Sequence, residues 1–212
     1  MYSLIIGLSP SVGARSPLLW NRAYKGCNIK CHMRPLDVEK KQDLVNILFQ
    51  LEKDDDYQGG SICFPYKEEF AKLLKSKLYD LSTKKLGAVN CIYRDSSGKL
   101  YGANTDGIAA LECIKKNFFN SINIPKKILI LGNGGVGKAV LSFIHDKLLN
   151  SFHEIKLYSA TRKINYDFYN NFPKVNIVDW AKRNEYINSG TLIINCTSIG
   201  DYENINESPI DY

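Results

Sequence analysis

A glycine-rich loop in the second half of the chain has the residue types and spacing of a nucleotide-binding turn. An apolar run at residues 128–131 precedes the loop, and an apolar helical pattern follows it. Glycines permit a tight turn and a close backbone approach, and the amino terminus of the following helix offers free N–H groups to a pyrophosphate. We therefore predict the opening of a dinucleotide-binding unit, with cofactor-binding residues Gly132, Asn133, Gly134, Gly135, Val136 and Gly137.

The same loop allows a second interpretation, as the phosphate-binding loop of a nucleotide kinase. Gly132, Gly135 and Gly137 lack the strict G-x-G-x-x-G spacing, and residues 132–138 read G-x-x-x-x-G-K. Ala139, however, stands where the kinase loop needs a Ser or Thr hydroxyl for magnesium. The strand before the loop and the helix after it favour a dinucleotide, and a phosphotransferase that binds ATP and magnesium is the alternative.

Ser16 is a candidate anion-binding residue near the amino terminus. We predict that it is the N-cap of a helix that has Pro17 as its first residue and ends near Gly26. A hydroxyl at a helix amino terminus is a ready site for an anion, because the free N–H groups there carry positive partial charge. A cap without a ligand explains the same residues.

The framework that positions these groups is predicted to alternate between strands and helices. In the first half we expect strands at residues 2–6 and 29–33, a strand that runs into a helix over residues 59–67, a hairpin of residues 88–93 and 100–103, and helices after Asp37 and Asn104. The helix after Asp37 is predicted to place Leu44, Val45, Leu48 and Leu51 on its core face. The helix that begins near residue 65 is predicted to place Phe70, Leu73 and Leu74 on its core face. In the second half, strands at residues 128–131, 155–158, 175–178 and 191–196 imply a parallel sheet with right-handed crossovers.

The composition is that of an ordinary globular protein. The 212 residues suit one large or two small domains, and 44% of them are hydrophobic and 24% charged. The net charge is +6 and the lysines are spread along the chain, so nucleic-acid binding is not indicated. Neither a signal peptide nor a run long enough to span a bilayer is recognised, and the cytoplasm is the expected location.

Six cysteines are present, and none of them forms a C-x-x-C pair. Since most have apolar neighbours, we expect buried free thiols in a reducing compartment. Cys27, Cys31 and His32 have metal-ligating side chains, but no second ligand pair follows, so no metal site is expected.

Six short motifs, in order along nearly the whole chain, together resemble the shikimate dehydrogenase family. They are Gly7 with Ser16, Pro17 and Asn21; residues 65–68; residues 87–90; residues 104–107; the glycine loop; and residues 195–200. The resemblance implies an α/β fold with two domains, a mixed α/β substrate-binding domain at residues 1–106 and a Rossmann-type NADP-binding domain at residues 107–212. Substrate and cofactor would meet in the cleft between them. It also implies a monomer or homodimer that reversibly reduces 3-dehydroshikimate to shikimate with NADPH, in chorismate and aromatic amino-acid biosynthesis.

Lys67 and Asp106 match the catalytic pair of the family. A ketone that becomes an alcohol needs a proton at oxygen as hydride arrives at carbon. A lysine beside an aspartate can supply that proton while it binds the substrate hydroxyls. Without the resemblance, Lys67 is interpreted as an exposed lysine in the first turn of a helix, and Asp106 as an ordinary N-cap.

The resemblance implies substrate contacts for four further residues. Asn90 matches a residue that hydrogen-bonds the substrate hydroxyls, and a turn residue is its alternative interpretation. Ser16 matches a serine that holds the substrate carboxylate, but the first of the family's two serines is missing, and Arg15 would compensate as a cation if it points inward. Cys63 stands where the family has a threonine that contacts substrate. Both departures are expected to lower affinity or to shift which polyol acid is preferred.

The cofactor contacts implied outside the glycine loop come from Thr161, Arg162, Cys196, Thr197 and Ser198. The family often places an arginine at the position of Ala160, where it binds the 2′-phosphate of NADP, and here Arg162 and Lys163 lie close by. No acidic residue ends the preceding strand to bind the ribose hydroxyls of NAD. NADP is therefore the expected cofactor and NAD the alternative, although a solvated basic turn would also explain the two cations.

The family normally continues beyond the position of Tyr212 with further nucleotide-domain structure. The resemblance therefore implies that the usual C-terminal segment is lacking, either in a fragment or in an unusually short protein. Two alternatives stay open at this stage: a quinate/shikimate dehydrogenase that uses NAD, and a non-catalytic, ligand-binding relative. Retention of Lys67 and Asp106 favours the enzyme.

Overall fold

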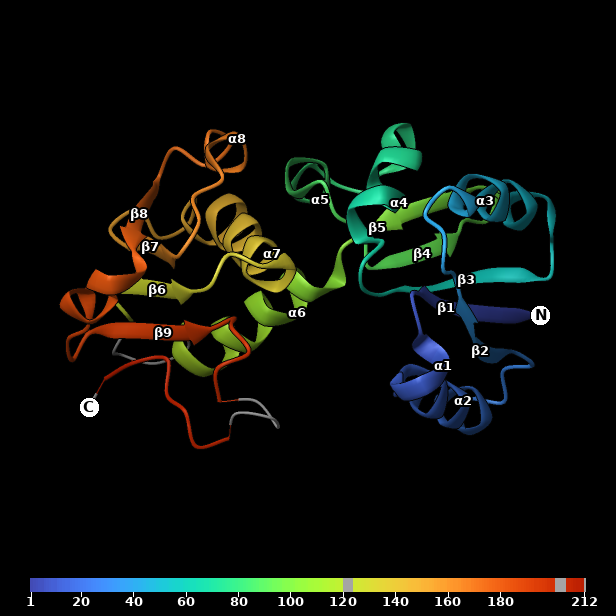
Figure 1. Cartoon of the computed structure of the whole chain (residues 1–212), viewed down its shortest axis with the longest axis horizontal. Coiled ribbons are helices and arrows are strands. Elements are labelled where there is room, and N and C mark those ends of the chain that lie inside the picture. Colours follow the sequence, from blue (N-terminus) through green and yellow to red (C-terminus); the bar gives the residue numbers. More distant parts are fainter. Residues whose placement is uncertain (120–123, 201–204, 212) are drawn as a thin grey trace. The chain divides into compact units, whose positions relative to one another are not determined.

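The computed structural model describes residues 1–119, 124–200 and 205–211. It divides into two compact units, unit 1 (Met1–Thr105) and unit 2 (Asp106–Tyr212) (Figure 1). Each unit is an α/β structure built on its own sheet, which confirms the predicted fold class. Among the described residues, no helix combines the length and hydropathy that a membrane span requires.

Unit 1 contains a mixed sheet of five strands in the order β2-β1-β3-β4-β5. The strands are β1 (Tyr2–Gly7), β2 (His32–Asp37), β3 (Tyr57–Ile62), β4 (Cys91–Arg94) and β5 (Leu100–Ala103). The first three are parallel, and β4 pairs antiparallel with both β3 and β5. The carboxyl ends of β1, β3 and β5 and the amino end of β4 therefore lie at one edge of the sheet.

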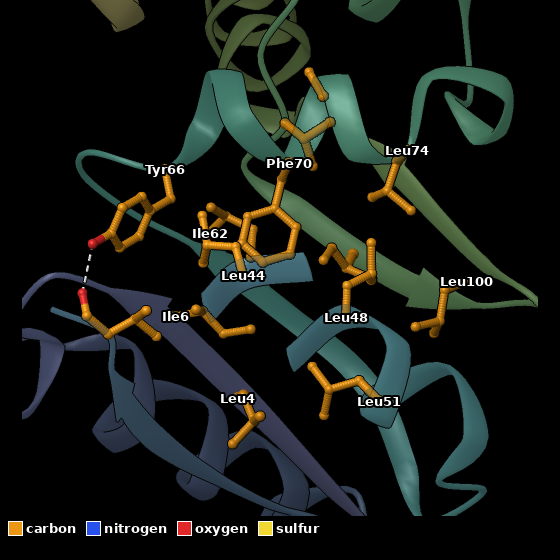
Figure 2. Packing of buried hydrophobic residues seen from close by; sticks show 14 of the residues in the cluster. Leu4, Ile6, Leu44, Leu48, Leu51, Ile62, Tyr66, Phe70, Leu74 and Leu100 are labelled. Carbon is orange, nitrogen blue, oxygen red and sulfur yellow. Dashed lines mark hydrogen bonds between the residues drawn. The ribbon is translucent and has the colours of Figure 1, made fainter. Parts of the chain in front are cut away.

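The helices of unit 1 are α1 (Pro10–Gly13), α2 (Ser16–Gly26), α3 (Asp43–Lys53), α4 (Lys67–Leu73) and α5 (Leu81–Leu86), with a 3-10 turn η1 (Lys75–Lys77). Figure 2 shows the main core, in which apolar side chains of β1 and β3 face those of α3 and α4. Phe70 of α4 is completely buried there. The Tyr66 hydroxyl donates to the Val38 carbonyl oxygen at 2.6 Å, which ties the start of α4 to the segment after β2 (Figure 2).

Several predicted details of these elements are wrong. The helix predicted to start after Asp37 begins only at Asp43, because Asp37 continues β2 and its carboxylate accepts hydrogen bonds from the backbone and hydroxyl of Ser11. The strand predicted at residues 29–33 begins at His32. On the predicted core faces, Val45 is 57% exposed and Leu73 is 37% exposed.

The helix predicted at Ser16 has the expected bounds but a different cap. Ser16 is its first helical residue, and Arg15 occupies the N-cap position without a side-chain capping bond. Arg15 has φ −82° and ψ −15°, a helical conformation rather than the extended one of a typical cap. The helix is attached to the sheet by Asn21, whose side chain donates to the Met33 carbonyl at 2.9 Å and accepts from the Met33 amide at 2.7 Å.

Unit 2 contains a four-stranded parallel sheet in the order β8-β7-β6-β9, as the alternation of strands and helices predicted. The strands are β6 (Lys127–Leu131), β7 (Lys156–Thr161), β8 (Val175–Asp179) and β9 (Thr191–Asn195). The connecting helices and turns are α6 (Thr105–Ile114), η2 (Lys115–Phe119), α7 (Gly135–Phe143), η3 (Ile144–Leu148), α8 (Tyr166–Tyr169) and η4 (Trp180–Tyr186). Since all strands run the same way, the loops that follow them share one edge of the sheet.

Candidate functional site

Cys63 lies at the carboxyl-terminal edge of the unit 1 sheet, directly after β3. Its amide donates to the Ile6 carbonyl at 2.9 Å, which extends the pairing of β3 with β1 by one residue. A Cβ on Gly7 would lie 2.1 Å from the Cys63 sulfur, so only glycine allows β1 to end against this thiol. The half-buried Cys63 is therefore held in a fixed position at the sheet edge.

Lys67 is the first residue of α4, and backbone hydrogen bonds hold both Lys67 and the residue before it. The Tyr66 amide donates to the Cys63 carbonyl at 3.1 Å, and the Val89 amide donates to the Lys67 carbonyl at 2.9 Å. The lysine is half-buried, in contrast to an ordinary exposed first-turn lysine. Its ammonium opposes the effect of burial on the Cys63 thiol, whose pKa burial raises.

Asn90 joins the same cluster through hydrogen bonds of its backbone and its side chain. Its amide donates to the Ala103 carbonyl at 3.1 Å, and its carbonyl accepts from the Ile62 amide at 2.8 Å. Its side-chain oxygen accepts from the Thr105 amide at 2.8 Å, and its side-chain nitrogen donates to the Thr105 hydroxyl at 3.0 Å. Thr105, which directly precedes Asp106 in the chain, thus holds the Asn90 side chain in place, although the motif at residues 104–107 assigned it no role.

Asp106 lies in the first turn of α6, where the partial positive charge of a helix amino terminus stabilises a carboxylate. The next residue, Gly107, allows α6 to lie very close to α7. A Cβ on Gly107 would meet the Phe143 ring at 2.3 Å and the Ala139 carbonyl oxygen at 2.6 Å. The start of α6 is therefore fixed by packing within unit 2.

The other two predicted substrate residues stand at the start of α2. Ser16 is half-buried and Arg15 is exposed. Arg15 occupies the N-cap position without a side-chain capping bond, and Ser16 places its hydroxyl at the first helical position. That hydroxyl and the amides of the first helical turn form a small group of hydrogen-bond donors suited to an anion.

The glycine loop of unit 2 follows β6 and has a backbone that only glycine permits at two positions. Gly132 has φ +92°, and a Cβ on Gly137 would lie 2.1 Å from the Gly132 carbonyl oxygen. At Gly134 and Gly135, by contrast, an added Cβ would meet nothing within 4 Å. The loop is therefore tightly folded on its inner side and open above the amino terminus of α7.

The residues of this loop fit the pyrophosphate and ribose groups of a dinucleotide. The N-cap of α7 is Gly134, which has no side chain to occupy the amides of the first turn. The side-chain oxygen of Asn133 is buried and accepts no hydrogen bond among the described residues. A buried acceptor without a donor costs free energy, and a bound ligand hydroxyl would satisfy it.

The loop after β9 lies against the glycine loop, which brings two groups of predicted cofactor residues together. The Cys196 amide donates to the Leu131 carbonyl at 2.8 Å. A Cβ added to Gly132 would lie 2.7 Å from the Thr197 methyl group. The Asn195 side chain accepts from the amide and the hydroxyl of Thr197 at 3.0 and 2.7 Å and so shapes this turn. Ser198 follows Thr197 in the same turn.

Substituting Gly137 with alanine is expected to lower the free energy of unfolding by about 1–3 kcal/mol and to weaken dinucleotide binding, because the new methyl group overlaps the Gly132 carbonyl oxygen. Thermal unfolding and equilibrium dialysis with NADP would measure the two effects. Gly135→Ala is the matched control for folding, since its Cβ enters open space. Equal stabilities of the two variants would contradict this account of the loop.

Thr161 is the last residue of β7, and Arg162 begins the basic turn that follows it. Ala160, at the position where the family often has an arginine, is completely buried in β7, so no side chain there reaches the surface. Arg162 is exposed, and its guanidinium carbon lies 4.9 Å from the ring centre of Trp180. Sequence reasoning did not identify Trp180, which follows β8.

The prediction of buried cysteines is wrong. Cys27 and Cys113 are exposed, the other four are half-buried, and all six are free thiols. Burial nevertheless raises the pKa of Cys63, against an opposing effect of the Lys67 ammonium, and burial raises the pKa of Cys196 to about 11. The apolar residues near the cysteines therefore indicated strands, but they did not show how much of each thiol is exposed to solvent.

These shifts predict the order in which the thiols react with iodoacetamide. The thiolate is the nucleophile, and a raised pKa leaves less thiolate at any pH below it. Cys27 and Cys113 should be alkylated first near neutral pH and Cys196 last, and raising the pH should accelerate labelling of Cys196. Peptide mass spectrometry over time would measure the order, and alkylation of Cys196 as early as Cys27 would refute it.

Comparison with known proteins gives consistent matches along the chain. The family model described as "Shikimate dehydrogenase substrate binding domain" matches residues 8–92. The shikimate dehydrogenase (NADP(+)) of Clostridium beijerinckii is 30% identical over 198 residues, which are 92% of this chain and 67% of that protein. The enzyme of the same name from Caldicellulosiruptor bescii is 28% identical over 93% of this chain and 66% of its own length.

Solved structures match over both units. Shikimate dehydrogenase 1 from Peptoclostridium difficile aligns with a TM-score of 0.69 and 28% identity, covering 99% of this chain and 71% of that one. A chorismate mutase/shikimate 5-dehydrogenase fusion protein from Clostridium acetobutylicum aligns with a TM-score of 0.75 and 25% identity over the same shares of the two chains. The present chain thus spans about two thirds of the length of the curated relatives that it matches.

Proposed function

Because this chain belongs to the shikimate dehydrogenase family, we propose that it catalyses the reversible, NADPH-dependent reduction of 3-dehydroshikimate to shikimate. The observation that carries this proposal is the cluster of Cys63, Lys67 and Asn90 at one edge of the unit 1 sheet. Asn90 in turn binds Thr105, the residue before Asp106. Within unit 1, this hydrogen-bond network therefore holds the backbone segments of Lys67 and Asn90, and Thr105 precedes Asp106 in the chain.

In this proposal the nicotinamide, when bound, supplies or accepts the hydride. The Lys67 ammonium donates a proton to the substrate oxygen during reduction and takes it back during oxidation. Asp106 binds a substrate hydroxyl. Asn90 binds a second hydroxyl, and Ser16, with Arg15 nearby in the chain, binds the substrate carboxylate at the start of α2.

We propose NADP as the cofactor. The open surface above the start of α7 supports binding of a dinucleotide pyrophosphate, and the unpartnered Asn133 oxygen supports a ligand that donates a hydrogen bond. β7 ends at Thr161 rather than at an acidic residue, which disfavours NAD, and Arg162 follows with an exposed positive charge. We also propose that the protein acts in the cytoplasm as a monomer or homodimer, which light scattering would distinguish.

Cys63 supports a second candidate function, the oxidation of quinate. A thiol in place of the threonine hydroxyl would change one hydrogen bond to the polyol and could alter which acid is preferred. A non-catalytic relative that binds the acid without turning it over is the remaining alternative. Lys67 and Asp106 argue against it, because ligand binding alone does not require a proton donor.

The test is the formation of NADPH by the purified chain with shikimate and NADP, with quinate and NAD run in parallel. We expect turnover with shikimate and NADP at a higher kcat/KM than with any other pair. Higher kcat/KM with quinate and NAD would assign the chain to the alternative enzyme. Binding of shikimate by calorimetry without turnover in any combination would refute the proposed reaction and support the ligand-binding relative.

A further inference from the structure

Trp180 and Arg162 are brought together by the register of two neighbouring parallel strands. Thr161, the last residue of β7, is the partner of Asp179, the last residue of β8. Arg162 and Trp180 are the next residues of their strands and therefore leave the sheet side by side. The distance of 4.9 Å from the guanidinium carbon to the indole centre is that of a cation–π contact.

Local hydrogen bonds fix both ends of this contact. The Thr161 hydroxyl donates to the Lys163 carbonyl at 2.9 Å and accepts from the Lys163 amide at 3.3 Å, so the turn that carries Arg162 is closed on itself. The Asp179 carboxylate accepts from the Ala181 amide at 2.8 Å and so caps η4, which begins with Trp180. The half-buried indole also packs against the core of unit 2.

A second arginine contacts the same indole but has a different environment. The Arg183 guanidinium carbon lies 4.7 Å from the Trp180 ring centre. Arg183 donates to the carbonyls of Trp180 and Pro209 and forms an ion pair with Asp211 at 3.2 Å, so its charge is paired and three of its five N–H donors are engaged. Arg162 makes no hydrogen bond or ion pair with the described part of the chain, and its N–H groups remain for a ligand.

We propose that Trp180 is a positioning residue that holds Arg162 ready for the 2′-phosphate of NADP and thereby determines the preference for NADP over NAD. This inference rests on the proposed function. A guanidinium stacked on an aromatic face keeps its N–H groups at the rim, where they bind a phosphate in bidentate fashion. The contact lies at the carboxyl edge of a parallel sheet, where dinucleotides bind. It supplies the cation that Ala160 does not.

The experiment measures binding rather than turnover, with adenosine 2′,5′-bisphosphate and adenosine 5′-monophosphate as probes in titration calorimetry. The variants are Trp180→Ala, Trp180→Phe, Arg162→Ala and the double variant of Arg162→Ala with Trp180→Ala. Trp20→Ala is the matched control, because Trp20 is the other tryptophan of the chain and lies on α2 in unit 1. Thermal unfolding establishes that each variant is folded.

We expect Trp180→Ala to weaken binding of the bisphosphate about 3- to 10-fold and to leave the monophosphate unchanged. Phenylalanine should restore most of the loss. Since Trp180 acts through Arg162, the double variant should bind the bisphosphate no more weakly than Arg162→Ala alone.

Three results would overturn the inference while leaving the proposed reaction intact: unchanged bisphosphate affinity in Trp180→Ala, an equal loss for both probes, or additive losses in the double variant. If the unmodified chain does not prefer the bisphosphate, the assignment of NADP fails and the inference fails with it. If Trp180→Ala does not fold, Arg162→Ala keeps the test decisive, because unchanged bisphosphate affinity in that variant would also overturn the inference.

Discussion

Replacing Lys67 with alanine is expected to reduce kcat for shikimate oxidation about 100- to 10,000-fold, the contribution usual for a positioned proton donor. The substitution removes an ammonium from the half-buried edge of the unit 1 sheet and leaves the backbone bonds around it intact. KM for shikimate should rise less than kcat falls, because the proton transfer is made only in the transition state. Steady-state kinetics of NADPH formation would measure both.

The matched control for this variant is Lys72→Ala. Lys72 lies on the same helix but is exposed, and its ammonium pairs with Glu69 at 2.9 Å on the surface. Loss of such an exposed pair changes stability little and should leave kcat unchanged. If the two lysine variants had the same kcat, Lys67 would be an ordinary lysine of the first helical turn and the proposed role would be refuted.

Substituting Asp106 with asparagine is expected to lower kcat at least about 100-fold, within the range of general acid–base catalysis. Asparagine has nearly the same shape and retains a hydrogen-bonding oxygen, so the start of α6 should stay folded against α7. What the variant loses is the negative charge and the acceptor strength of a carboxylate. Kinetics with shikimate, together with thermal unfolding, would separate catalysis from stability.

Glu112→Gln provides the control for Asp106. It makes the same chemical change on the same helix, at an exposed carboxylate that pairs with Lys115 at 3.5 Å. Both variants should unfold within a few degrees of the unmodified protein, and only Asp106→Asn should lose turnover. Full activity of Asp106→Asn would leave Asp106 with the simpler role of stabilising the amino terminus of α6.

Local sequence patterns predicted the helices, strands and turns whose conformation depends on residues close together in the chain. The apolar run of β1, the bounds of α2, the hairpin of β4 and β5 and the glycine loop before α7 are all confirmed. Each depends on residues within one or two turns of chain: alternating apolar side chains, Pro17 in the first helical turn, or glycines that tolerate a positive φ. The alternation of strands with helices was also sufficient for the parallel sheet of unit 2.

The features that the sequence did not reveal depend on contacts between distant residues. Asp37 looked like a helix cap, but its partner is Ser11, 26 residues earlier in the chain. Ser16 looked like a cap because its neighbours suit one, but Arg15 before it already has helical torsion angles. The contact of Arg162 with Trp180 requires the register of β7 against β8, which no local pattern encodes.

The candidate site likewise contains residues that short motifs predict and residues that are recognised only by their contacts in the structure. Short motifs predicted Lys67, Asn90 and Cys63 as site residues, and the structure brings their segments together through backbone hydrogen bonds. The motifs alone did not reveal the contacts of Thr105 with Asn90 and of Trp180 with Arg162, because a residue that holds another in place is recognised by its partner rather than by its type.

The most direct test of the central proposal follows the transferred hydrogen itself. Shikimate deuterated at the carbon that becomes the ketone would be incubated with NADP and the unmodified chain, and the reduced cofactor would be analysed by mass spectrometry. The proposed reaction predicts reduced cofactor that carries the deuterium, together with a slower initial rate than with ordinary shikimate if hydride transfer limits turnover. Reduced cofactor without deuterium, or none at all from a folded chain that binds both ligands, would contradict it.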